Sequence, residues 1–513
     1  MRIAKLTTIG DQFNLIALLK FVHILALITF LTYASSTKMN GREIKWDALE
    51  NVVASYHLWT KGTISLDGEK PSYFREPLPI VIGALHMALF TDIPKFDNTE
   101  SFDDEFDNEG RISQAKLKYP RELMASERYR TQISYINLFY IAGSLLVVWW
   151  LTKLMTDSYV WSTLSMLMTW VFFYNNYYYL YRPLSEYLSS LLIMLSSGLM
   201  ILILRSKSVN LAVLLGVVLG ALALTKAATL YVSVVAIFFV YSALVIYKQC
   251  SFTHAIKFFL ASSLSLFILV TPWMLRNKLE FDDLALTQRG GGVLLTRAFK
   301  NQMTDDEYQG AWYVYAPAEL KRITWYRKTM HGEQSATRYA RLYRNRPGDV
   351  EAIESGNVDA ATSYFCKSRA LLKKLAKEQG LDAKGADLQA EKIAKQMIKK
   401  DFAKHLKTTP IFAWRQIWSF GNTNPVQPSA GSIFTAIINF ASFVALLALP
   451  LIAILRKQPV WFLFSLFPFG IFWFHALFSH AIPRYSAPLI PTAIIALILL
   501  LCALIKLFSK HKN

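Results

Sequence analysis

The chain has 513 residues, of which 53% are hydrophobic and 14% aromatic, with a mean hydropathy of +0.29 and a formal net charge of +19. Apolar content this high, gathered into long runs almost without charge, argues against a large soluble helical protein. The positive charge points to loops beside a membrane rather than to nucleic-acid binding, because no ordered array of aromatic residues accompanies a basic groove.

Ten apolar segments are long enough, or nearly so, to cross the ~30 Å of hydrocarbon in a bilayer. They lie near residues 12–34, 131–153, 157–175, 183–204, 209–225, 227–247, 256–274, 433–455, 459–478 and 484–508. The first segment is interpreted as a retained span, because it is long and no small-residue cleavage motif follows it. The expected fold class is an all-α polytopic membrane protein with about ten, and between nine and thirteen, transmembrane helices.

The charges of the short connections give an orientation. With the N-terminus in the cytoplasm, every short inner connection is basic, as the positive-inside rule requires. These connections contain Lys153, Arg205, Lys207, Lys248, Arg456 and Lys457. Two long polar stretches, near 35–130 and 275–430, then lie outside. No Asn begins a glycosylation sequon, which favours a bacterial inner membrane, and the three cysteines suggest neither a disulfide nor a metal site.

This topology divides the chain into three parts. Residues 1–275 are expected to form a transmembrane module whose first periplasmic loop covers 35–130. Residues 276–430 are expected to form a periplasmic, mostly helical region between the seventh and eighth spans. Residues 431–513 are expected to contribute the C-terminal transmembrane helices.

The first outer loop contains two expected interfacial helices. Residues 46–61 have an apolar face and a polar face, which is typical of a helix in the membrane interface, and Gly62 is placed to end it. The apolar run 77–90 is too short to span with assurance and suits a re-entrant or interfacial helix. The acidic tract from Asp97 to Glu109 lacks the ligand spacing of a calcium loop, so a solvated loop is favoured over a cation site.

Later segments have plainer interpretations. The tyrosines between Asn175 and Pro183 suit an interfacial aromatic belt, with contacts to a sugar or a lipid headgroup as the alternative. Gly216 and Gly220 form a GxxxG pattern, which favours close packing against a neighbouring helix. The glycines 290–292 do not form a nucleotide motif, because neither a strand-to-helix context nor a Lys-Ser/Thr pair accompanies them.

Ionisable residues collect at the outer ends of the spans, where such groups are costly and usually functional. They are Asp47, Arg75, Glu76, Arg182, Glu186, Lys226, Arg276 and Arg484. Several cations on one face suggest an anionic ligand such as phosphate, and carboxylates among them suggest acid–base chemistry or a metal. Plainer interpretations stay open: Asp47 as a helix cap, and the cations as side chains that reach toward the lipid headgroups.

Four stretches resemble the GT-C superfamily of polytopic glycosyltransferases, especially bacterial relatives of the protein O-mannosyltransferase and aminoarabinose-transferase branch (family 39-like). These are Asp47 to Gly62, Tyr73 to Pro77, Leu219 to Lys226, and the pair of outer-edge motifs Thr271–Asn277 and Ile482–Pro488. Their order and shared sidedness carry the resemblance, which covers most of the membrane part. The family often has a second acidic residue in an Arg-x-Asp setting. Here the nearest match is Arg182 to Glu186, so the chain departs from that pattern.

The resemblance implies a sugar donor on a polyprenyl phosphate and an acceptor hydroxyl on a glycolipid, a polysaccharide or a protein. It implies Asp47 as the catalytic base. Donor phosphate or sugar binding would fall to Arg75, Glu76, Arg182, Glu186, Lys226, Arg276, Arg484 and Tyr485. A divalent metal occurs in the superfamily, but no ligand spacing here demands one. His57 and His480 are interpreted as ordinary polar interfacial residues.

Two other functions are kept as alternatives. A lipid-linked glycan ligase or polymerase also has large outer loops and arginines, but it needs no acid in the first loop. A transporter is expected to place charged residues in mid-span. Here they gather at one edge, which counts against transport.

Overall fold

The structure is a computed structural model that describes residues 4–102, 117–323, 325, 339–343, 346–418 and 430–510. Within these ranges the regular elements are almost entirely helical, and the strands form one two-stranded antiparallel sheet. The chain is an all-α, multi-pass membrane protein, as the sequence predicts.

Ten apolar helices coincide with the ten expected spans. They are α1 (Ala4–Ser36), α6 (Ile136–Thr156), α7 (Tyr159–Asn175), α9 (Glu186–Ser206), α10 (Val209–Thr225), α11 (Thr229–Ile246), α12 (Phe252–Phe281), α21 (Ala430–Leu455), α22 (Pro459–Phe478) and α23 (Ile490–Lys510). In the described part of the chain, eight helices are long and apolar enough to cross a membrane, and α7 and α10 have 17 residues each. Seventeen helical residues reach about 25 Å, which is at the short end for a span.

The remaining elements lie outside the spans. The first loop contains α2 (Asp47–Lys61), α3 (Pro77–Phe90), β1 (Glu100–Phe102), β2 (Leu117–Tyr119), α4 (Arg121–Ala125) and α5 (Glu127–Ser134), and α8 (Tyr177–Leu180) follows α7. The long region after α12 contains α13 (Gly291–Lys300), α14 (Asp305–Val314), α15 (Ala318–Lys321), η1 (Ala340–Leu342), α17 (Asp349–Ser355), α18 (Tyr364–Glu378), α19 (Ala383–Lys400) and α20 (Phe402–Ile417). Two short 3₁₀ turns, η2 (Pro483–Tyr485) and η3 (Ala487–Leu489), lead into α23.

The mostly helical character expected for 276–430 is therefore confirmed for its described residues. Strands β1 and β2, which pair Glu100 with Tyr119, were not expected. Most of the acidic tract, from residue 103 to 109, lies outside the described residues.

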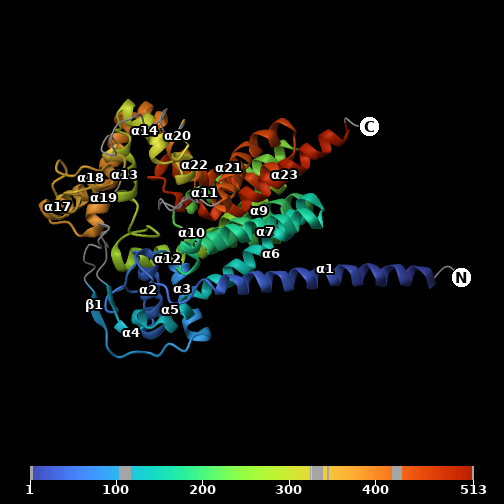
Figure 1. Cartoon of the computed structure of the whole chain (residues 1–513), viewed down its shortest axis with the longest axis horizontal. Helices are drawn as coiled ribbons and strands as arrows, with labels where there is room; N and C mark the ends of the chain where they lie inside the picture. Colours follow the sequence, from blue (N-terminus) through green and yellow to red (C-terminus); the bar gives the residue numbers. More distant parts are fainter. Residues whose placement is uncertain are drawn as a thin grey trace.

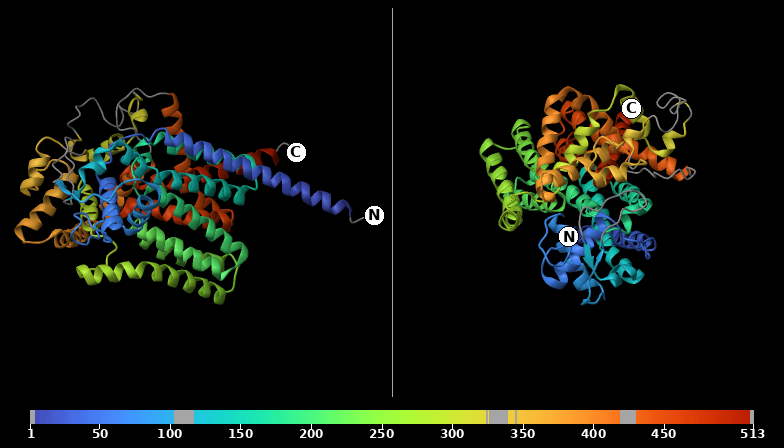
Figure 2. Two further views of the ribbon diagram at one scale, coloured as in Figure 1. Left: turned by 90° about the horizontal axis from the view of Figure 1, so that it is seen from below. Right: turned by 90° about the vertical axis from the view of Figure 1, so that its left-hand side faces the viewer.

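The two extramembrane regions meet at one end of the bundle. In Figure 1 the helices α2, α5, α13 and α17–α19 lie at the left, whereas both ends of the chain lie at the right. The left view in Figure 2 agrees with this separation. An even number of spans has this consequence, so the arrangement fits ten crossings.

Close contacts between helix backbones fix part of the bundle. A Cβ added to Gly216 on α10 would lie 2.1 Å from the carbonyl oxygen of Ser262 on α12, and one on Gly220 would lie 3.2 Å from that of Leu266. Only glycine allows the two backbones to approach this closely at Gly216. The predicted packing role of the GxxxG pattern is confirmed.

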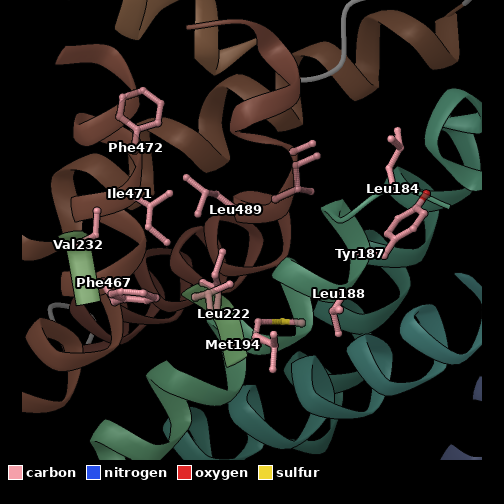
Figure 3. Packing of buried hydrophobic residues seen from close by; sticks show 14 of the residues in the cluster. Leu184, Tyr187, Leu188, Met194, Leu222, Val232, Phe467, Ile471, Phe472 and Leu489 are labelled. Atoms are coloured by element: carbon pink, nitrogen blue, oxygen red, sulfur yellow. The ribbon is translucent and has the colours of Figure 1, made fainter. Parts of the chain in front are cut away.

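The membrane core joins helices that are distant in sequence. Figure 3 shows side chains of α9, α10, α11, α22 and η3 meeting between the helices, among them Met194, Leu222, Phe467 and Leu489. Each of these four is fully buried. Their packing holds the outer ends of α9, α10 and η2 near one another, and these ends carry the charged residues described next.

Helix α2 has the ends that the sequence predicts. It begins at Asp47 and stops where Gly62 takes a left-handed φ of 73° and donates its N–H to the carbonyl of Leu58 at 3.0 Å. Glycine suits this position because a Cβ would be strained there.

The surroundings of α2 differ from the prediction. Every residue from Ala48 to His57 is buried, so α2 does not present separate apolar and polar faces to a membrane interface. Its polar side chains have protein partners: Glu50 binds Arg75, and Asn51 donates to the carbonyl of Pro183 at 3.2 Å. His57, expected to be an interfacial residue, is fully buried, and its Nδ1 donates to the carbonyl of Ser65 at 3.0 Å. The helix is an internal wall of the site.

Candidate functional site

A cavity of about 1810 Å³ opens where the first loop, the outer ends of the spans and the second extramembrane region meet. Pockets for a single drug-sized ligand usually measure roughly 300–1,000 Å³. The volume therefore leaves room for two substrates. The cavity brings together most of the predicted site residues, namely Asp47, Arg75, Glu76, Arg182, Lys226, Arg484 and Tyr485.

Asp47 is the first residue of α2, where a carboxylate also complements the helix dipole. Its side chain is 35% exposed and faces arginines at both oxygens. Oδ2 accepts from Nη1 of Arg484 at 2.6 Å, whereas Oδ1 pairs with Arg75 and lies 3.8 Å from Nη1 of Arg289. Three cations from distant parts of the chain thus converge on one carboxylate.

Glu186 extends this arrangement. It begins α9, its side chain is 2% exposed, and its Oε1 accepts from Nε of Arg484 at 2.6 Å and from Nζ of Lys226 at 3.3 Å. Lys226 follows directly after α10 and ends it. Arg484 therefore connects Asp47 with Glu186, and we call Asp47, Glu50, Arg75, Glu186, Lys226, Arg289 and Arg484 the charged cluster.

The arginines control the charge state of Asp47. Its burial alone would raise the pKa, but the attraction of Arg75, Arg484 and Arg289 outweighs this effect and holds the pKa well below its usual value. Asp47 is thus ionised at neutral pH and, with all its arginines in place, a weak base. It becomes a stronger base when another anion takes over part of that positive charge.

Two residues beside the cluster have strained backbones. Trp46, directly before Asp47, has φ 54° and ψ −132°, and Ala481, three residues before Arg484, has φ 43°. The other described non-glycine residues with positive φ follow the ends of helices, where the left-handed conformation is common. Such strain costs of order 1–3 kcal/mol and collects at functional sites.

Arg182 and Tyr485 line the cavity through aromatic contacts. The guanidinium of Arg182 lies 4.6 Å from the ring centre of Trp46 and so helps to hold the residue before Asp47. The ring of Tyr485 stacks on His475 at 4.8 Å and meets His480 edge-on at 5.5 Å. Glu76 lines the cavity at the start of α3.

Two predicted site residues do not line the cavity. Glu186 contacts it only through Lys226 and Arg484, which do line it. Arg276 lies outside both the cavity and the charged cluster. Its Nη1 donates to the carbonyl of Ser72 at 3.2 Å, and its guanidinium lies over Trp273 at 4.8 Å and over Phe281 at 5.0 Å. Its predicted role in phosphate binding has no support in this placement.

Two members of the charged cluster were missed in the sequence. Glu50 lies one helical turn after Asp47, so the i,i+3 spacing alone indicates that both carboxylates share a face of α2. Arg289 stands just before the triple glycine, and no local sequence pattern marks it as part of a site. The triple glycine in fact binds a carboxylate: the N–H groups of Gly290, Gly291 and Gly292 donate to Asp387 at 3.0, 2.7 and 2.8 Å.

One side of the cavity is apolar and belongs to α11 and α22. Val232 and Trp473 line it, as do the stacked rings of Tyr231 and Phe474. Tyr231 is 67% exposed and lies in the first turn of the apolar helix α11. The cavity therefore extends from the charged cluster to exposed apolar residues of α11, one of the expected spans.

The described residues contain no group of three or more His, Cys, Asp or Glu that could hold a metal ion. In the charged cluster, Asp47, Glu50 and Glu186 are each paired with arginine or lysine. Each carboxylate of the cluster thus already has a cation of the protein as its partner.

No protein-family model matches the sequence, and no curated protein matches it significantly. Among solved structures, the fold is similar to the crystal structure of ArnT from Cupriavidus metallidurans bound to undecaprenyl phosphate. The match covers 93% of this chain and 77% of that one, at 11% sequence identity and a TM-score of 0.37. A likeness at this level does not bear on the reaction, so function is inferred from the site itself.

Proposed function

We propose that the protein is a glycosyltransferase that moves a sugar from a polyprenyl-phosphate donor to an acceptor hydroxyl, with Asp47 as the base. One observation carries the proposal: Asp47 lies in a large cavity with arginines at both of its oxygens. Transfer from a phosphate ester needs a base for the acceptor and cations for the leaving phosphate. The charged cluster supplies both.

The sugar donor is expected to bind in the part of the cavity that contains Lys226 and Arg484. These two cations stand next to the apolar wall of α11 and α22, which leads to the exposed apolar residues of α11. A polyprenyl chain suits such a wall, and its phosphate would then meet Lys226 and Arg484. Arginine can bind two phosphate oxygens at once. Arg182, over Trp46, adds positive charge to the same cavity.

The reaction follows from this placement. Asp47 takes the proton of the acceptor hydroxyl while the hydroxyl oxygen forms a bond to the anomeric carbon of the donor. The bond from that carbon to the phosphate oxygen breaks, and its electron pair leaves with the polyprenyl phosphate. Lys226 and Arg484 stabilise the charge that develops there.

Donor binding would also activate the base. A phosphate that competes for Arg484 removes positive charge from Asp47 Oδ2 and brings negative charge close to it. Both changes raise the pKa of Asp47 from its depressed value toward one that suits a base. Arg75 and Glu50 are positioning residues, since Arg75 binds Asp47 and Glu50 together.

We further place the protein in a bacterial inner membrane with the cavity on the periplasmic side. The basic inner connections support this orientation, because they join the ends of the spans opposite to those that carry the cavity residues Lys226 and Arg484. We also propose that the chain divides at residues 275 and 430 into a transmembrane module, a periplasmic helical region and the C-terminal transmembrane helices. The last helix of the periplasmic region, α20, leads back to the bundle and packs on α22.

The test is the transfer rate of Asp47→Asn and Asp47→Ala in membranes supplied with a polyprenyl-phosphate sugar. Both are expected to lose about 10²–10⁴-fold, since that is the usual contribution of a positioned base. The control is Glu391→Gln, which removes a cavity carboxylate that pairs with Lys395 and lies outside the charged cluster. Full activity of Asp47→Asn would refute the proposal. Transfer only from an oligosaccharide diphosphate would favour the ligase alternative.

A further inference from the structure

Two arginines line the extramembrane wall of the cavity. Arg289 belongs to the connection between α12 and α13, and Arg369 belongs to α18. Each guanidinium lies near an aromatic ring, Arg289 at 4.7 Å from the centre of Phe74 and Arg369 at 5.1 Å from that of Phe365. Aromatic packing of this kind orients a guanidinium and leaves its N–H edge for other partners.

These N–H groups have few partners in the protein. Among the described residues neither arginine donates a side-chain hydrogen bond, Arg369 forms no ion pair, and Arg289 has only Asp47, at 3.8 Å. A guanidinium offers five N–H donors. Both arginines line the open cavity, and none of their nitrogen atoms is buried without a partner, so these donors are accessible from the cavity. The free donors therefore suit a ligand.

The two arginines also repel each other. Burial lowers the pKa of Arg369, and the nearby charge of Arg289 lowers it further. The charges of Asp387 and Asp47 offset part of this effect. The oxygens of Asp387, however, already accept three backbone N–H groups at the start of α13. Asp387 and Asp47 therefore compensate only part of the positive charge of Arg289 and Arg369, and an anionic ligand could compensate the rest.

This wall lies on the far side of Asp47 from the donor cations. Asp47 faces Arg484 with Oδ2 and Arg289 with Oδ1, and Arg484 continues to Glu186 and Lys226. A base placed between two cationic sites can meet a donor phosphate on one side and an acceptor on the other. The cavity volume of about 1810 Å³ allows both at once.

We propose that Arg289 and Arg369 form an acceptor site that binds an oxyanion, so that the natural acceptor is a hydroxyl compound carrying a phosphate or a carboxylate. The inference rests on the proposed function. It adds a specificity-determining pair that holds the acceptor through its charged group and so presents its hydroxyl to Asp47.

The experiment uses the full-length protein in phosphatidylcholine nanodiscs, first empty and then saturated with undecaprenyl phosphate. Glucose 6-phosphate, glucuronate and glucose are titrated by calorimetry. We expect the two anionic sugars to bind in both states and neutral glucose to bind at least tenfold more weakly. The stronger of the two anionic sugars identifies whether the acceptor carries a phosphate or a carboxylate.

Variants assign the binding to the arginines. Arg369→Gln is expected to weaken the anionic sugars by about tenfold or more, the usual effect of losing a charged hydrogen bond. Arg369→Lys keeps the positive charge but loses the planar, two-pronged donor geometry of the guanidinium, so its affinity for the anionic sugars is expected to be intermediate. Lys373→Gln on the exposed face of the same helix is the matched control and should bind like the wild type. Affinity for undecaprenyl phosphate should stay within about twofold in Arg369→Gln and fall in Lys226→Gln.

Two results would overturn the inference: equal binding of glucose and the anionic sugars, or a loss of undecaprenyl phosphate affinity in Arg369→Gln as large as in Lys226→Gln. Failure of the proposed function has a different signature. In that case undecaprenyl phosphate does not bind the wild type, whereas the sugar titrations in empty nanodiscs still decide whether the arginine pair binds an oxyanion.

Discussion

Arg75 and Arg297 are both buried guanidinium groups in the extramembrane part of the molecule, but they have different kinds of partner. Arg75, 4% exposed, pairs with the carboxylates of Asp47 and Glu50 at the wall of an open cavity. Arg297, on α13, is fully buried, and no described carboxylate pairs with it. Its neutral partners are the side chains of Asn301, Thr408 and Thr409, the carbonyl of His405 and the ring of Phe412, 3.9 Å away.

The difference separates a structural cation from a functional one. The partners of Arg297 are buried, and neither they nor Arg297 line the cavity. Burial lowers the pKa of Arg297 to about 9, which still leaves it charged at neutral pH. In the charged cluster the partners are carboxylates beside a cavity, and a ligand phosphate can replace them. Burial alone therefore does not identify a site; exchangeable charged partners do.

Removing Arg75 is expected to have the largest effect on stability. Arg75→Met leaves the buried carboxylate of Glu50 and one oxygen of Asp47 without their partner, and orphaned buried charges cost about 3–5 kcal/mol. Thermal and denaturant unfolding in detergent would measure this. Adding Glu50→Gln should recover part of the loss. A destabilisation below about 1 kcal/mol would mean that the pair does not hold α2 in place.

Removing Arg297 is expected to cost less. Arg297→Met leaves neutral groups without a donor but orphans no charge, so about 1–3 kcal/mol is expected from the same unfolding measurement. Binding of undecaprenyl phosphate should be unchanged, because Arg297 does not line the cavity. The contrast between the two regions fails if Arg297→Met is more destabilising than Arg75→Met or weakens lipid binding.

The smallest expected effect on stability is a pH dependence that comes from His405, a neighbour of Arg297. Burial, and then the charge of Arg297, lower the pKa of His405 from 6.5 to about 4. Since the unfolded chain takes up the proton first, stability is full above about pH 6.5 and decreases as the pH falls toward 4. Allowing for screening, the loss is about 1–2 kcal/mol.

The control for this pH effect is His405→Gln, which keeps an acceptor for Asn301 but cannot titrate. His57 and His86 also have lowered pKa values, so only the difference between wild type and variant reports on His405. If the stability of both proteins decreases identically between pH 6.5 and pH 4, His405 is not the source of the pH dependence.

The spans and the outer ends of the charged helices could be predicted from the sequence because hydrophobic length and the charge of short connections are local properties. Lys226, Glu186 and Arg484 were placed at the same membrane edge for this reason, and the structure brings them within hydrogen-bond distance. The ends of α2 were also predictable, from Asp47 and Gly62.

Rotation about a helix axis could not be predicted in the same way. Arg276 stands at the right depth, but successive helical residues differ by about 100° in direction. Its side chain therefore turns to Trp273 and Phe281 instead of the cavity. Arg289 depends on the path of a long connection, which no periodic pattern describes. The burial of α2 depends on partners, such as Arg75 and Pro183, that its own sequence does not specify.

The most direct test of the exchange between carboxylate and phosphate is the affinity of Asp47→Asn for undecaprenyl phosphate, measured alongside its transfer rate. Removing the charge that competes for Arg484 should leave this affinity equal to that of the wild type or raise it, while transfer is lost. If binding and transfer are lost together in a folded variant, Asp47 only anchors the arginines and is not the base. If transfer is retained, the base lies elsewhere.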